Sequence, residues 1–196
     1  SGSSGTSGTG VAPATDAAPG ADGSADAGSC TVKSTGPRAG TIALSLGGGP
    51  SWANPSEALV ANGNAASVAV TPSADESAIL VVRGFSIQLP GSARVLGVTV
   101  SVTARGGTDV RDREVHLSLD GVTSAGDDRG NGDDLPALFS TLVYGGPSVT
   151  WGAPLSPESV GGDGFGVMLR AKYHGDVTEG GGAFVDGVTV DVTYCE

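Results

Sequence analysis

The sequence has little lysine, few aromatic residues and no long apolar run. Lysine occurs only at Lys33 and Lys172, and the formal net charge is −11. Nucleic acid and anionic membrane surfaces repel a chain this acidic, so neither is an expected partner. The longest aliphatic stretch, 78–82, is only as long as a strand, and it excludes a membrane-spanning helix. No signal peptide is visible, so we expect the sequence to represent a mature, exported form.

Residues 1–29 contain one valine, Val11, and no other branched aliphatic residue or aromatic ring. Such a segment buries too little apolar surface to offset the entropy lost on ordering, so we predict a low-complexity N-terminal arm or linker. Its Gly/Ser/Thr opening is also what often follows the processed cysteine of a lipoprotein, although that cysteine is absent here. Lipid anchoring before maturation is therefore one alternative.

The cysteines, Cys30 and Cys195, stand at the two ends of the remaining block, 30–196. The ends of a domain often lie close together, so the spacing favours a disulfide that closes this block. A disulfide implies an extracellular, cell-surface or periplasmic setting. The alternative is a pair of buried, reduced cysteines in a cytosolic domain.

Apolar and polar residues alternate repeatedly along 30–196, as in strands with one buried face. We predict an all-β fold, an antiparallel, jelly-roll-like β-sandwich of about nine strands separated by Gly, Pro and Asp turns. Single helical turns are expected at 55–60 and 156–160, where Pro follows Asn54 and Ser156. The strands are predicted at 30–34, 41–46, 67–71, 78–88, 98–104, 115–119, 137–144, 165–173 and 188–194.

Several short motifs occur in a characteristic order between residues 50 and 195. They are Trp-Ala-Asn-Pro at 52–55, Phe-Ser-Ile-Gln-Leu-Pro at 85–90, Val-Leu-Gly-Val-Thr-Val at 95–100, Tyr-Gly-Gly at 144–146, Trp-Gly at 151–152, Phe-Gly-Val at 165–167, and Val-Asp-Gly-Val-Thr-Val at 185–190 before Tyr194. In this order they resemble a jelly-roll-type β-sandwich module of bacterial secreted and cell-surface proteins and some phage structural proteins. The resemblance implies a surface-exposed structural or binding role and no enzymatic activity.

The segment 127–134 is the densest acidic cluster. Its oxygens could bind calcium, although the spacing does not match the EF-hand loop, and a solvated acidic turn is the alternative. No other cofactor is expected. The candidate ligands are Asp127, Asp128, Asn131, Asp133 and Asp134.

Four aromatic residues could form a sugar-stacking platform, namely Trp52, Tyr144 and Trp151, with Tyr173 beside them. The alternative is that they pack in the core or close the ends of the sandwich. The mixed-charge segment 109–114 is expected to form surface ion pairs. His116 and His174 have no ligand-spaced partner, which argues against a zinc site.

These features suggest three functions. The first is an extracellular structural protein, a subunit of a surface filament, appendage or surface assembly, which associates with copies of itself through the arm and unpaired edge strands. The second is a carbohydrate-binding or adhesive surface module with glycans as partners. The third, a secreted polysaccharide-acting enzyme, is the least favoured, because no catalytic constellation such as Gly-x-Ser-x-Gly is present.

Overall fold

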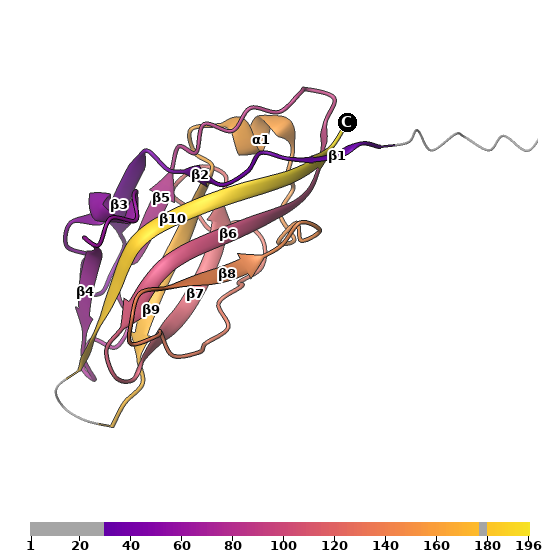
Figure 1. Cartoon of the computed structure of the whole chain (residues 1–196). Coiled ribbons are helices and arrows are strands. Elements are labelled where there is room, and N and C mark those ends of the chain that lie inside the picture. The colour runs from indigo at the N-terminus through magenta and orange to yellow at the C-terminus, as the bar shows by residue number, and fades with distance from the viewer. Residues whose placement is uncertain (1–29, 177–179) are drawn as a thin grey trace, which may run out of the picture.

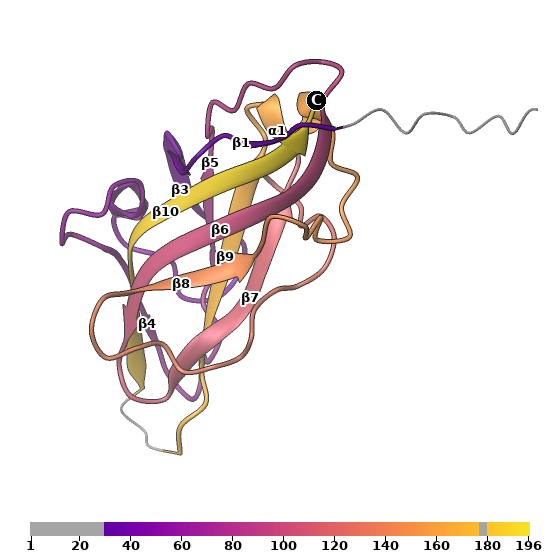
Figure 2. The ribbon, with the colours of Figure 1, turned by 45° about the vertical axis from the view of Figure 1, so that its right-hand side comes forward.

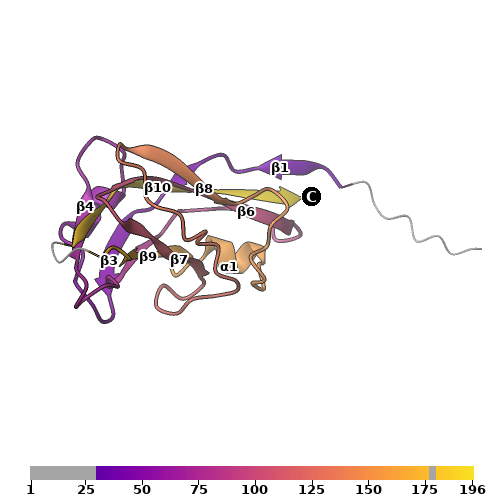
Figure 3. The same cartoon turned by 90° about the horizontal axis from the view of Figure 1, so that it is seen from below.

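The computed structural model describes residues 30–176 and 180–196. They form two antiparallel sheets that pack face to face, with the six-stranded sheet in front in Figure 1 and the four-stranded sheet behind it. The turned view in Figure 2 and the view from below in Figure 3 show the same two layers. The fold is thus the predicted all-β antiparallel sandwich, with ten strands in the described residues where about nine were predicted. The predicted arm, 1–29, lies outside the described residues.

The six-stranded sheet, here called sheet A, has the order β1-β10-β6-β8. The short strands β2 and β4 also pair with β10, which is the longest strand and organises this layer. The strands of sheet A are β1 (Val32–Ser34), β2 (Arg38–Ala39), β4 (Ala66–Val70), β6 (Arg94–Gly106), β8 (Ser140–Gly145) and β10 (Gly181–Cys195).

The four-stranded sheet, here called sheet B, has the order β3-β5-β9-β7. Its outer edge along β7 is covered by the segment 125–135, whose backbone bonds to Val110, Val115 and Leu117. The strands of sheet B are β3 (Ile42–Leu46), β5 (Ile79–Arg83), β7 (Val110–Ser118) and β9 (Gly166–Tyr173).

The core lies between the two sheets and follows the predicted alternation. Along β6 every second residue from Val98 to Ala104 is buried, while the residues between them are partly exposed. The inward residues of β9 and its approach, 165, 167, 169, 171 and 173, are all buried as well. Since valine and leucine supply most of this interior, the sparse aromatic content does not prevent a continuous core.

The end of β10 departs from the predicted pattern. Val188, Val190 and Val192 face the core as expected, but Tyr194 is partly exposed and Cys195 is buried instead. A register shift lies at this point, between Thr193 and Tyr194, and the residue that it leaves without a partner is Leu96 of β6. The strand also begins at Gly181, well before the predicted residue 188.

Both predicted helical turns are present. Pro55–Ala58 forms a 3₁₀ helix, η1, after Asn54, and Pro157–Gly161 forms α1. The Ser156 hydroxyl accepts a hydrogen bond from the Ser159 amide, while the Ser159 hydroxyl accepts one from the Ser156 amide. This reciprocal cap explains why α1 begins there. No helix among the described residues is long and apolar enough to cross a membrane.

The predicted disulfide is present between Cys30 and Cys195, whose Cα atoms lie 5.5 Å apart. It joins the start of the sandwich to the end of β10, where Val32 pairs with Cys195 in the β1–β10 register. The first and last strands of the described chain are therefore linked both by backbone hydrogen bonds and covalently.

Candidate functional site

The predicted sugar platform does not form an exposed surface. Trp52, Tyr144 and Trp151 are all buried, so none can stack on a ligand. The Trp52 indole donates to the Ala78 carbonyl at 2.8 Å, and the Trp151 indole donates to the Val98 carbonyl at 2.8 Å. Each indole N–H group thus has a hydrogen-bond acceptor inside the fold, which agrees with the alternative that these residues pack in the core.

The predicted calcium ligands do not converge on a common point. The Asp128 carboxylate accepts from the amides of Val115 and Gly130, and Asp127 pairs with Arg129 at 3.0 Å. Asp133 accepts from the Asn131 side chain at 2.7 Å. Asp134 lies 2.5 Å from the Nε2 atom of His174. Within residues 30–176 and 180–196, no group of three or more His, Cys, Asp or Glu side chains could hold a metal ion.

Asp112 differs from its prediction as a surface charge. It is buried, because a register shift between Asp112 and Glu114 turns it toward the interior. It accepts from the Gly132 amide at 2.7 Å, from the Asn131 amide at 3.4 Å and from the Tyr144 hydroxyl at 2.9 Å. Burial raises the pKa of Asp112 despite these donors, and burial beside this carboxyl group also raises the pKa of Tyr144.

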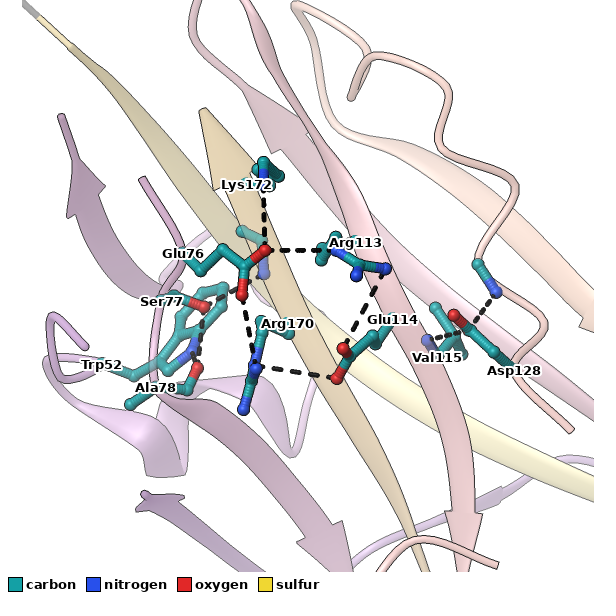
Figure 4. Close-up of polar contacts among 12 residues, drawn as sticks. Trp52, Glu76, Ser77, Ala78, Arg113, Glu114, Val115, Asp128, Arg170 and Lys172 are labelled. Atoms are coloured by element: carbon teal, nitrogen blue, oxygen red, sulfur yellow. Dashed lines mark hydrogen bonds and ion pairs between the residues drawn. The ribbon is translucent and has the colours of Figure 1, made fainter. Parts of the chain in front are cut away.

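Two other charges of this segment, Arg113 and Glu114, join an ion-pair network on the outer face of β7 and β9 (Figure 4). Glu76 is its centre and contacts Arg113, Arg170 and Lys172 at 3.2, 3.5 and 3.0 Å. The hydrogen bond from Lys172 holds the pKa of Glu76 below its usual value. Because its charges are paired internally, this face offers few free groups to a ligand.

The outer face of sheet A is different, since it carries uncharged polar side chains that are half-buried or exposed. In the register, Thr103 of β6 lies between Gly187 of β10 and Thr141 of β8. The next outward row has Ser101 beside Thr189. These residues line a hollow of about 330 Å³ with 59–61, which follows η1.

An arginine and two phenylalanines continue this face beyond Thr103. Arg105 pairs with Phe184 across β6 and β10, and its guanidinium carbon lies 3.8 Å from the centre of the Phe184 ring. The Phe139 ring, just before β8, lies 5.1 Å from the same carbon. We call these three side chains the Arg–Phe cluster. They line a second hollow of about 360 Å³, together with Asn54, Glu57, Gly63, Asn64, Ala65 and Ser67.

A buried carboxylate fixes the wall of both hollows. Asp186 lies beside the β10 bulge and accepts from the Asn62 amide at 2.9 Å and the Gly63 amide at 3.1 Å. Leu59 forms a β-bridge with Gly187, so the loop 59–64 lies against the sheet. The two hollows share no lining residue but follow each other along the outward side of β6, about 13 Å from Ser101 to Arg105 at the usual rise per residue of a strand, and we call the pair the groove.

The groove residues were absent from the sequence-based candidates. The alternation of β6 places Thr99, Ser101, Thr103 and then Arg105 on the outward side, and this was the available signal. Phe184 gave none, because it follows a glycine run that is typical of a turn. Only the pairing of β6 with β10 brings its ring to Arg105.

No protein-family model matches the chain, and no curated protein matches it. Among solved structures, the chain is similar to the N-terminal cellulose-binding domain of β-1,4-glucanase C from Cellulomonas fimi, with 15% identity and a TM-score of 0.32. The match covers 79% of this chain and 86% of that one. A likeness at this level establishes neither a common family nor a common ligand, and the resemblance to one bacterial module family stays a prediction.

Proposed function

We propose that the chain is an extracellular, non-catalytic module that binds carbohydrate along the outer face of sheet A. The observation that carries this proposal is the groove, which combines half-buried phenyl rings with neutral hydrogen-bonding groups on a face that the loop 59–64 covers only in part. Ligand sites of this kind use apolar contact for affinity and a few fixed polar groups for orientation. Sugars present both apolar C–H faces and hydroxyl edges, so they suit this combination.

The rigidity of the groove also supports binding. Its floor consists of the paired strands β10, β6 and β8, and its wall is held by the two amides that donate to Asp186. A preformed site loses less entropy when its ligand binds than a site that must order itself. The disulfide fits an oxidising compartment, where extracellular polysaccharides would be the accessible glycans.

Removal of the aromatic surface tests the proposal. The full chain would be screened on a glycan array, and hits would be measured by calorimetry for wild type and for Phe184→Ala with Phe139→Ala. We expect at least a tenfold loss of affinity in the double variant. Tyr194→Ala removes a partly exposed ring from the far end of the same strand and serves as the matched control. Equal affinity in wild type and the double variant, or no glycan binding by wild type, would overturn the proposal.

Self-association, the function predicted first from the sequence, is a second candidate function. Strand β8 pairs only with β6 in the part of the chain that the structure describes, so its other edge is open. Val143 on this strand is 62% exposed and Leu138 just before it is 79% exposed. An open edge with apolar neighbours is a template for strand addition by a second copy. Light scattering of wild type and Val143→Lys would decide, since a monomeric wild type rules this function out.

A further inference from the structure

Arg105 is held in a defined position. Its guanidinium group contacts the Phe184 ring at 3.8 Å and the Phe139 ring at 5.1 Å, and the β6–β10 register fixes the base of its side chain. Cation–π contacts of this kind are worth about 0.5 to 1 kcal/mol at exposed sites and restrict the guanidinium group. They use the faces of the rings and none of the five N–H donors of the arginine.

The charge of Arg105 has no partner among the described residues. No hydrogen bond or ion pair engages it within residues 30–176 and 180–196. By contrast, Arg113, Arg170 and Lys172 share the carboxylate of Glu76 on the opposite sheet (Figure 4). Glu57 lines the same hollow as Arg105, but no ion pair joins the two. In a chain with a net charge of −11, a positioned and unpaired cation in a groove is a feature that a ligand can use.

We propose that the groove takes a polysaccharide containing uronic acid residues, and that Arg105 binds the carboxylate of one of them. The inference rests on the proposed function and names its ligand class. Guanidinium groups match carboxylates with two parallel N–H···O bonds, which gives direction as well as affinity. The neutral neighbours Asn54, Asn64 and Ser67 suit sugar hydroxyls in the same hollow.

Glu57 lines the same hollow as Arg105 and would repel a uronate carboxylate, so its charge opposes the attraction of Arg105 for an acidic glycan. Replacement of Glu57 by Gln keeps a hydrogen-bond acceptor and removes the repulsion. Affinity for the acidic glycan should then rise severalfold, while affinity for a neutral glycan should not rise.

The experiment compares matched glycans that differ only in charge. Hexasaccharides of glucuronate, galacturonate and mannuronate would be measured beside their carboxyl-reduced counterparts by calorimetry, at low and moderate salt. We expect at least tenfold tighter binding of one acidic member than of its neutral counterpart, a preference that added salt weakens. Arg105→Gln should abolish the preference, and Arg105→Lys should restore part of it. Arg94→Gln removes the same charge from the exposed start of β6 and is the control.

The outcomes separate the two proposals. Equal or tighter binding of the neutral hexasaccharides overturns the uronate inference and leaves carbohydrate binding intact. A preference for the acidic member that survives in Arg105→Gln, with a wild-type thermal unfolding curve, also overturns it. Preference for a sulfated neutral glycan over every uronate overturns the carboxylate assignment. Absence of binding to any glycan on the array overturns both proposals.

Discussion

Removal of the Cys30–Cys195 disulfide should lower the stability of the chain by an amount that follows from its position. The two cysteines are separated by 165 residues, so the bond closes nearly the whole described chain. In the chain-entropy relation a loop of this length restricts the unfolded state by about 5 kcal/mol. Engineered and natural disulfides often contribute less, and we expect a loss of about 3 to 5 kcal/mol in the variant Cys30→Ser with Cys195→Ser.

On the side of Cys30 the folded state contributes little to this loss. All three residues of β1 are exposed, so the strand next to Cys30 buries almost no apolar surface. Cys195 is buried, so its replacement adds a smaller folded-state cost, and the loss should arise mainly in the unfolded chain, which becomes less compact when the link is cut. The slope of unfolding free energy against denaturant should rise accordingly, since a more open unfolded state exposes more surface.

Guanidinium denaturation of wild type and the double variant measures both quantities. Reduction of wild type should reproduce the behaviour of the variant, and the variant should not respond to reductant. Intact-mass analysis of unreduced protein after alkylation under denaturing conditions checks that both sulfurs are engaged. A stability difference below about 1 kcal/mol, or ready alkylation of both thiols before reduction, would refute the reasoning.

Three further substitutions test the interior. Burial gives Asp112 a higher pKa in the folded state than in the unfolded state, so the folded state binds the Asp112 proton at a higher pH. The free energy of unfolding of wild type should therefore rise relative to that of Asp112→Asn as pH falls from neutral through the raised pKa. Chemical denaturation at a series of pH values measures this difference. Gly145→Ala should cost about 2 kcal/mol or more in thermal unfolding, because Gly145 has φ 72° and a Cβ atom there would overlap the Val98 carbonyl and the Trp151 indole. Ser156→Ala should cost about 1 kcal/mol in the same assay by removing the cap of α1, and no change would contradict its role.

Much of the fold could be predicted because alternation is local. The sequence pattern alone predicts the inward valines of β6, the inward residues of β9 and the helix cap at Ser156. β10 was harder, since its glycine-rich start is a strand only because β4 and β6 pair with it on both sides. The bulge at Asp186 then changes which residues of β10 face inward, and no local pattern shows this.

The candidate site depended on long-range pairing and was missed for that reason. Arg105 was visible as an outward residue, but its partner Phe184 is distant in sequence and meets it only through strand register. The aromatic residues chosen from the sequence, including Trp151, have rings that could stack on a ligand and that are equally suited to pack in the core. Their buried N–H groups find backbone carbonyl acceptors, and sequence composition cannot distinguish this from exposure.

The two buried aspartates also affect how the chain ages chemically. The sequence has two Asn-Gly pairs, Asn62–Gly63 and Asn131–Gly132, and the dipeptide is prone to deamidate when the glycine nitrogen attacks the asparagine side chain to close a succinimide ring. In the fold the glycine nitrogen of the first pair donates to Asp186, and that of the second donates to Asp112. Each glycine nitrogen is thereby engaged by a carboxylate and is less free to attack the asparagine side chain. Deamidation at both pairs should therefore proceed more slowly in the folded chain than in the unfolded chain.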